Sequence, residues 1–176
     1  MDRKYEFIDE TITIDNHILR RSKAIETVGT VRVGDLGGFI ESENNLSHTG
    51  TCWISNNACV YERAWVFADA QICGNAHVFG GSQISGDAQI CGNAQIFGNS
   101  VIFGDAHIYG DARIYGNSEV FGYAEIFEDA CVTGGVWIAG KPRIDSGIWN
   151  KVIKIGMTYY IISTTLKKIK TLTTLM

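Results

Sequence analysis

The sequence lacks the segments that mark secreted, membrane-spanning and zinc-binding proteins. Its first residues, 1–7, hold no apolar secretory core, and no apolar run is long enough to span a bilayer. The five cysteines are odd in number and include no C-x-x-C pair, so neither a disulfide framework nor a common zinc motif is indicated. We therefore expect a cytoplasmic protein with reduced thiols and no metal centre.

Acidic residues are absent from the end of the chain. None follows Asp145, where five lysines give a charge of +5, whereas the preceding part carries 10 basic and 19 acidic residues, a net charge of −9. This asymmetry can steer a partner. Five lysines are too few, and the body too acidic, to indicate nucleic-acid binding. At 176 residues and 45% hydrophobic, the chain is long enough for one core and too short for two ordinary ones.

What the sequence does contain is a period of six residues. From Ile54 to Ile144 an Ile or Val recurs at every sixth position without a slip. A small residue, usually Ala, stands two places before it, and Gly stands two places after it throughout 74–122. A period of six fits neither an α-helix nor an isolated strand, so it is the period of a supersecondary unit.

The chemistry of the positions indicates what this unit is. The small residue and the aliphatic residue lie two apart, so both point to one face of a short strand and the residue between them points to the other. Gly followed by Asn or Asp is a strong turn signal because these residues tolerate positive φ. A turn after every short strand winds the chain into a β-solenoid whose interior holds the Ile/Val and Ala/Ser columns.

The repeats resemble a known family. The units at 96–100 (I-F-G-N-S) and 108–112 (I-Y-G-D-A) are similar to the hexapeptide repeat of left-handed parallel β-helices. This resemblance implies three hexapeptides per coil, so that residues 18 apart stack, and it implies a homotrimer. The superfamily includes coenzyme A-dependent acyltransferases, γ-type carbonic anhydrases and scaffold proteins, and the fold alone does not choose among them. Residues 34–47 resemble the lead-in of poorly characterised bacterial and phage β-helix proteins labelled as transferases.

Three parts of the chain are predicted. Residues 1–50 form an N-terminal β cap and lead-in, because 11–14 alternate in polarity, Asp15-Asn16 is a turn pair and 17–20 can return as a hairpin. Residues 51–146 form the hexapeptide-repeat β-helix. Residues 147–176 form a C-terminal cap and basic tail, with 152–166 apolar enough to cover the last coil.

Aromatic residues occupy the position after the aliphatic residue in many repeats. At a spacing of 18, one column holds Tyr61, Phe79, Phe97 and Tyr115, and another holds Phe103 and Phe121. Such columns can stack on an outer corner and stiffen the rod, and exposed apolar surface usually marks an interface. The predicted interface residues are Phe79, Phe97, Phe103, Tyr115 and Phe121.

The outward strand positions supply the candidates for chemistry. His107 lies next to Glu125 in one column, where a carboxylate can orient an imidazole as a general base, although a solvated polar ladder is the ordinary interpretation. Arg113 and Arg143 are the candidates for binding an anionic ligand. His77 and His107 fall in different columns and the close histidine pair of γ-type carbonic anhydrases is absent, so no metal site is predicted.

Three functions follow, in order of preference. The first is a non-enzymatic scaffold that binds another protein, with a phage-type inhibitor of a host protein as one form. The second is an acyltransferase that uses acetyl-CoA, and the third sequesters a small anionic ligand between subunits. No insertion interrupts residues 54–144, where hexapeptide acyltransferases commonly carry a loop that encloses acceptor or coenzyme A, and this favours the scaffold.

One geometric prediction tests the coil length. Cys73 and Cys91 share a repeat position 18 residues apart. Their Cα atoms should therefore lie about 4.7–4.9 Å apart, the spacing of neighbouring strands. We expect two reduced thiols that a mild oxidant can join, and a separation beyond about 7 Å would reject the register.

Overall fold

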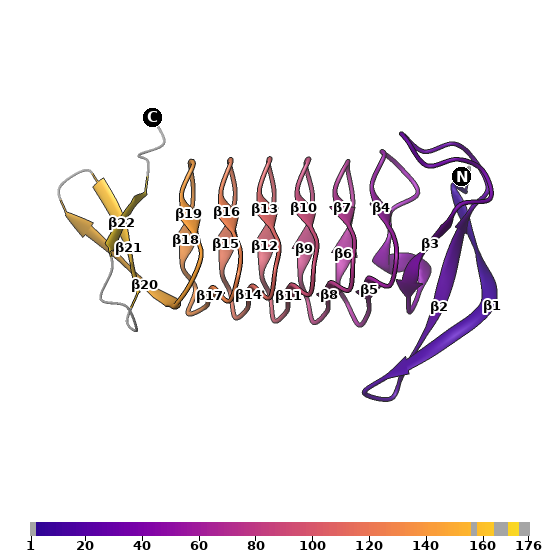
Figure 1. Cartoon of the computed structure of the whole chain (residues 1–176), viewed down its shortest axis with the longest axis horizontal. Coiled ribbons are helices and arrows are strands. Elements are labelled where there is room, and N and C mark those ends of the chain that lie inside the picture. Colours follow the sequence, from indigo (N-terminus) through magenta and orange to yellow (C-terminus); the bar gives the residue numbers. More distant parts are fainter. Residues whose placement is uncertain (1–2, 156–157, 164–168, 173–176) are drawn as a thin grey trace.

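The computed structural model describes residues 3–155, 158–163 and 169–172, and it shows a rod of stacked β coils with further strands at each end (Figure 1). Within these residues there is no α-helix, and one short 3₁₀ turn, η1, spans Glu43–Asn45. The chain is therefore an all-β parallel solenoid, which confirms the predicted fold class.

Three parallel sheets form the sides of the rod. The His107 side consists of β4 (Trp53–Ile54), β7 (Gln71–Ile72), β10 (Gln89–Ile90), β13 (His107–Ile108), β16 (Glu125–Ile126) and β19 (Arg143–Ile144). The Arg113 side consists of β5 (Cys59–Val60), β8 (His77–Val78), β11 (Gln95–Ile96), β14 (Arg113–Ile114) and β17 (Cys131–Val132). The third side, which we call the tryptophan face, consists of β6 (Trp65–Val66), β9 (Gln83–Ile84), β12 (Val101–Ile102), β15 (Glu119–Val120) and β18 (Trp137–Ile138).

Within these three sides, each strand pairs with the strand 18 residues further on, so each of these coils contains three hexapeptides. His107 is the register partner of Glu125, and Val101 is that of Glu119. The Cα atoms of Cys73 and Cys91 lie 4.6 Å apart, which confirms the predicted register. Figure 1 shows the coils in a straight row, so equivalent residues form straight columns along the rod.

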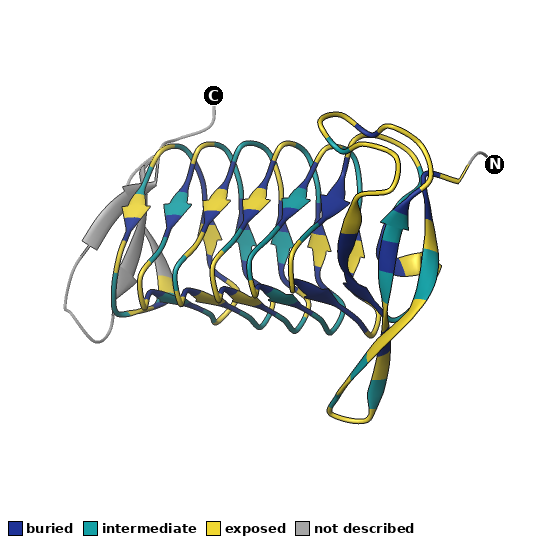
Figure 2. Cartoon of the chain, turned by 45° about the vertical axis from the view of Figure 1, so that its right-hand side comes forward, coloured by how far each residue is buried: buried dark blue, intermediate teal, exposed yellow. Residues whose placement is uncertain are grey.

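The core is the narrow interior of these coils. Every Ile or Val of the column from Ile54 to Ile144 is fully buried, and the alanines two places before them are buried as well (Figure 2). Three serines replace alanine at the entry to the tryptophan face, and all three are also fully buried. Each donates its hydroxyl to a carbonyl three residues earlier, as Ser100 does to Phe97 at 2.9 Å, so each of the three buried hydroxyls has a hydrogen-bond partner.

The corners explain the glycines of the repeat. Gly98, for example, has a φ of 75°, and a Cβ there would lie 2.7 Å from the carbonyl oxygen of Gly116 on the next coil. Both the left-handed backbone and the close stacking of corners exclude a side chain at this position. Four corners use other residues at positive φ: Asn56, Glu62, Ala68 and Glu128.

An N-terminal hairpin closes one end of the rod. Strands β1 (Tyr5–Ile14) and β2 (His17–Ala24) pair antiparallel around Asp15 and Asn16, both at positive φ, as predicted. Strand β3 (Leu36–Ile40) then pairs antiparallel with β2 and parallel with β5, so the parallel ladder begins before residue 51. The tip of the hairpin extends beyond the edge of the coils (Figures 1 and 2).

The cap buries three residues whose repeat positions lie outside the column of Ile and Val: Trp53, Cys59 and Tyr61. Trp53 is 2% exposed because strand β3 packs directly on its ring. The backbone of Gly37 in β3 lies so close that a Cβ on this residue would be 3.0 Å from the indole ring. Cys59 and Tyr61 are equally buried in a small apolar cluster with Leu19 and Phe39. Outward positions of the repeat can therefore belong to the core where the cap covers them.

The other end of the rod continues as strands. β20 (Ile148–Ile155) pairs parallel with β17, then antiparallel with β21 (Thr158–Ser163), which pairs with β22 (Ile169–Leu172). The side chains of residues 152–176, on which the C-terminal cap and the basic tail were predicted, lie outside the described residues.

Candidate functional site

The two residues of the predicted acid–base pair, His107 and Glu125, lie in one column, as the 18-residue spacing predicts, and the carboxylate has another partner. His107 and Glu125 are register partners on the His107 side, as the 18-residue spacing requires. The Glu125 carboxylate, however, binds Arg143 on the following coil, with an Nη1–Oε2 distance of 2.8 Å. The described residues contain no hydrogen bond between His107 and Glu125, and His107 is exposed. No carboxylate orients this imidazole as a general base would require.

The two arginines predicted to bind an anion lie on different sides of the rod. Arg143 is held by Glu125 and also lies over the Phe127 ring, 5.3 Å from its centroid. Arg113 lines a hollow of about 400 Å³. Two carboxylates, Asp111 and Asp129, line the same hollow and reduce its attraction for an anion.

The rest of this hollow is lined by Tyr115, Cys131 and Ile148. The Cys131 thiol donates to the Tyr115 hydroxyl at 3.7 Å, and this contact raises the pKa of Tyr115. A phenol with its ordinary pKa of about 10 is already neutral near pH 7, so this group offers a hydrogen bond rather than a charge.

The predicted aromatic columns are present. The rings of Tyr61, Phe79, Phe97 and Tyr115 stack with centroid distances of 5.0, 5.0 and 4.8 Å and are nearly parallel. Phe103 and Phe121 stack at 4.8 Å on another corner. A third stack, Tyr109 on Phe127 at 5.1 Å, was not predicted, although the same 18-residue spacing indicates it. Most ring faces in these columns therefore contact each other rather than solvent.

The largest exposed aromatic side chains lie on the tryptophan face and its corner. Trp65 is 43% exposed and Trp137 58%, at the two ends of the column Trp65, Gln83, Val101, Glu119, Trp137. The adjoining corner carries Phe103, 36% exposed, and Tyr123, 57% exposed. The repeat pattern places both tryptophans at outward strand positions, but neither was predicted as an interface residue. Tyr123 was not predicted either, because it lies in a turn rather than at a strand position.

A polar cluster at the hairpin tip was not predicted. The His17 ring lies between two carboxylates, with Nδ1 2.9 Å from Glu41 and Nε2 3.6 Å from Glu62. The hydrogen bond that His17 donates to the Glu41 carboxylate is the main cause that raises the pKa of His17, and the same bond lowers the pKa of Glu41. Nearby, burial lowers the pKa of His77. The cluster fastens the hairpin tip to the first coils, and non-adjacent positions such as 17 and 62 carried no sequence signal for it.

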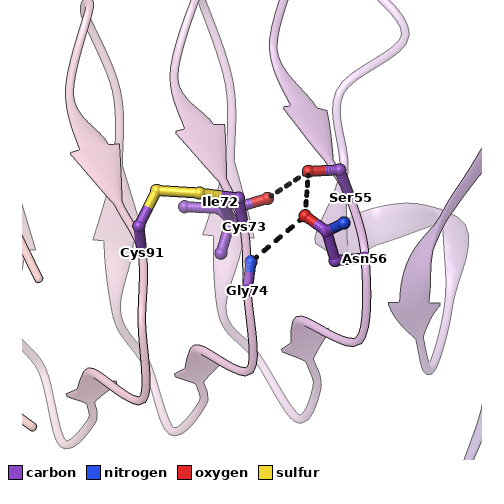
Figure 3. The surroundings of a disulfide bond; sticks show 6 residues. All are labelled: Ser55, Asn56, Ile72, Cys73, Gly74 and Cys91. Carbon is purple, nitrogen blue, oxygen red and sulfur yellow. Dashed lines mark hydrogen bonds between the residues drawn. A yellow bond between two sulfur atoms is a disulfide. The ribbon is translucent and has the colours of Figure 1, made fainter. Parts of the chain in front are cut away.

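Cys73 and Cys91 are joined by a disulfide, so the expectation of two reduced thiols was wrong. Figure 3 shows the bond connecting two neighbouring coils at one corner. On the preceding coil, Asn56 occupies the same corner, and its Oδ1 accepts the amide of Gly74 at 3.3 Å (Figure 3). This corner is thus fastened between coils by a hydrogen bond and a covalent bond.

The described residues contain no group of three or more His, Cys, Asp or Glu side chains that could hold a metal ion. None of the described helices has the length and apolar character needed to cross a membrane.

Comparison with known protein families finds one match. A family model described as "YdcK Beta solenoid repeat" matches residues 70–86 and 88–104. These two segments contain β7 to β12, about one coil each, where the repeat is most regular. A comparison with curated proteins finds no match. The matching description names a repeat fold and no activity, so function must be argued from the surface of the rod.

Proposed function

We propose that this protein is a non-enzymatic β-solenoid scaffold that binds protein through the tryptophan face and its adjoining corner. The observation that carries this proposal is the exposure of four large aromatic residues on one side of the rod: Trp65, Phe103, Tyr123 and Trp137. Contiguous exposed apolar surface marks interaction sites, and Trp and Tyr are enriched at the centres of protein interfaces.

The shape of the rod supports the same proposal. Between β4 and β19 each side consists of two-residue strands in straight columns, with no long loop between them. Flat columns give a broad contact surface, whereas small-molecule sites are usually concave and enclose most of the ligand. The predicted interface residues Phe79, Phe97 and Tyr115 lie in the four-ring stack, where they contribute more to stiffness than to exposed surface. Phe103 and Phe121 belong to the proposed surface.

Acyl transfer from acetyl-CoA is the alternative. It rests on the resemblance to hexapeptide acyltransferases and on the neighbouring positions of His107 and Glu125. The ion pair between Glu125 and Arg143 weakens it, because a carboxylate already bound to a guanidinium is a poor orienting group for a histidine. Sequestration of an anionic ligand is weaker still, since carboxylates accompany both arginines.

The test compares two sets of substitutions on different sides of the rod. The Trp65→Gln/Trp137→Gln variant should lose a protein contact of the wild type, measured as self-association of the pure chain and as capture of a lysate protein identified by mass spectrometry. The His107→Gln variant is the matched control and should keep that contact. Coenzyme A titration and an acetyl-transfer assay run in parallel. Acetyl transfer abolished by His107→Gln, or equal protein contacts in all three proteins, would overturn the proposal.

A further inference from the structure

We propose that the partner on the tryptophan face is a second copy of this chain, packed face to face with its rod running in the opposite direction. This inference rests on the proposed function, because it assigns an occupant to the same surface. It comes from the order of residues along the face, which reads nearly the same in both directions.

The outward column is close to a palindrome. From β6 to β18 it holds a tryptophan, a polar residue, a valine, a polar residue and a tryptophan: Trp65, Gln83, Val101, Glu119 and Trp137. A two-fold axis that crosses the rod at β12 reverses this order. Trp65 then meets Trp137 of the second copy, Gln83 meets its Glu119, and Val101 meets its own copy. Interfaces with two-fold symmetry require this kind of self-complementarity.

The polar pair in this arrangement is chemically matched. Within the described part of the chain, neither Gln83 nor Glu119 has a side-chain hydrogen bond or ion pair. A Gln amide donates to a carboxylate, so two copies would satisfy both groups twice. Two glutamates at these positions would instead repel each other.

The corner after the tryptophan face, which holds Phe67, Ser85, Phe103, Phe121 and Ala139, supports the same axis. Because the axis lies in the face and runs across the rod, this corner meets the same corner of the second copy. Phe67 then lies opposite Ala139 and Phe121 opposite Ser85, so large residues meet small ones. Phe103, the central residue of the corner, meets its own copy.

The charged residues of the same corner would form one kind of favourable contact and one unfavourable contact between the two copies. Asp69 falls opposite Lys141, giving two opposite-charge pairs per dimer. Asp105 falls opposite its own copy at the axis, at the edge of the contact, which is unfavourable. Exposed pairs of this kind affect register and direction more than affinity.

The other two sides do not have this property. Reversing the six residues of the His107 side sets the buried Trp53 against Arg143 and Gln71 against Glu125, with no apolar pair. On the Arg113 side, the hairpin cluster buries Cys59 at one end of the column. Among the described sides, the tryptophan face alone is both uncovered and matched to its own reverse.

The size of the face predicts a dimer of moderate affinity. Trp65 and Trp137 are four strand spacings apart, about 19 Å. Such a face is smaller than the standard interface of about 800 Å² per partner, so we expect a dissociation constant on the order of micromolar. The two pairs of tryptophans would supply most of the binding energy.

The first test is sedimentation of the full chain over a range of concentrations. The wild type should dimerise, and Trp65→Gln/Trp137→Gln should weaken dimerisation about tenfold or more. Asp105→Asn should strengthen dimerisation, since it removes the like-charge contact. The melting temperature at low concentration controls for folding. A wild-type chain that stays monomeric throughout, or forms trimers, would overturn the inference.

The second test determines direction with introduced cysteines in a Cys131→Ser background. A mixture of Gln83→Cys and Glu119→Cys chains should form a mixed disulfide dimer under mild oxidation, whereas neither variant should pair with itself. Val101→Cys should pair with itself. Efficient self-pairing of both Gln83→Cys and Glu119→Cys would indicate rods running in the same direction and overturn the inference.

These outcomes separate the two proposals. If the chain is monomeric but captures a lysate protein that the double tryptophan variant loses, the inference about a second copy fails and the scaffold function stands. If the tryptophan substitutions change neither self-association nor capture, both fail.

Discussion

Two tryptophans of the first coil occupy equivalent repeat positions but differ in surroundings. Trp53 and Trp65 both stand immediately before a buried aliphatic residue, so both point out of the rod. Trp53 is 2% exposed and Trp65 is 43% exposed. The difference arises outside the repeats, because β3 and Tyr5 cover Trp53 and nothing in the described structure covers Trp65 to the same degree. In this solenoid the repeat determines which side chains point into the rod. The cap determines which of the outward-pointing side chains are nevertheless buried.

The largest effect on stability is expected from changing an inward residue far from the cap. Ile108→Asn places an unsatisfied amide in a fully buried column and removes aliphatic contacts. We expect a loss of about 3–6 kcal/mol in the free energy of unfolding, combining truncation and desolvation. Urea denaturation measures it. A loss below about 1 kcal/mol would mean that the column can rearrange around a polar group.

The comparison itself is tested by matched truncations. Trp53→Ala removes a buried ring and should cost about 3–5 kcal/mol. Trp65→Ala removes a partly exposed ring stacked on Phe67 at 4.0 Å, so we expect about 1 kcal/mol or less. Both values come from denaturant titration at low protein concentration. Equal losses would show that the cap does not make Trp53 part of the core.

A smaller effect concerns the fastening of the hairpin tip. The folded pKa of His17 is raised above its ordinary value of 6.5, mainly by Glu41 and further by Glu62 and Asp15. Its contribution is therefore fully present below pH 6.5 and is lost as the pH rises through the folded pKa. Glu41, whose pKa is lowered, acts oppositely: its contribution is lost only as the pH falls through its own folded pKa.

His17→Gln tests this fastening. Burial lowers the pKa of two other histidines, His48 and His77, and the His77 ring contacts Tyr61 beside the cluster. Their contributions to stability therefore change with pH in the opposite direction to that of His17. The difference between wild type and variant isolates the contribution of His17. The stability difference between wild type and variant should shrink as the pH rises from 6.5 through the folded pKa of His17. Amide exchange of 11–20 should show the same trend locally. A difference that grows with pH would contradict the assignment.

The smallest effect is expected from His107→Ala. This residue neighbours Ile108 but is exposed, and no hydrogen bond of its side chain occurs among the described residues. We expect a change within about 0.5 kcal/mol and an unaltered melting temperature. Partner binding by the scaffold should also be unchanged. A large loss of stability would place His107 in a contact that the column geometry does not contain.

The interior of the rod could be predicted from sequence because its period is regular. The Ile/Val column, the 18-residue coil and the approach of Cys73 to Cys91 all follow from counting. The disulfide itself did not follow, since proximity does not determine oxidation. The ion pair between Glu125 and Arg143 did not follow from counting either, because the column gives Glu125 a neighbour on each side, His107 and Arg143, and the spacing does not choose between them.

The burial of Trp53, Cys59 and Tyr61 could not be predicted by counting. It depends on where a non-repetitive hairpin folds back, and that path is set by long-range contacts such as Arg21 with the carbonyl oxygens of Gly37 and Asn56. Likewise, the cluster of His17, Glu41 and Glu62 joins three segments that share no pattern.

The stacking of corner glycines on the next coil also bears on how this protein can evolve. Because the coils between β4 and β19 repeat the same 18-residue register, recombination between similar gene segments can add or remove a whole coil there without moving any residue to another side. Gain of a single hexapeptide would instead rotate all later residues onto the next side of the rod. Each added coil between Trp65 and Trp137 would lengthen the tryptophan face by one strand spacing, about 4.8 Å. The number of coils thus sets the length of the tryptophan face. Two rods that pair in opposite directions would have to carry the same number of coils.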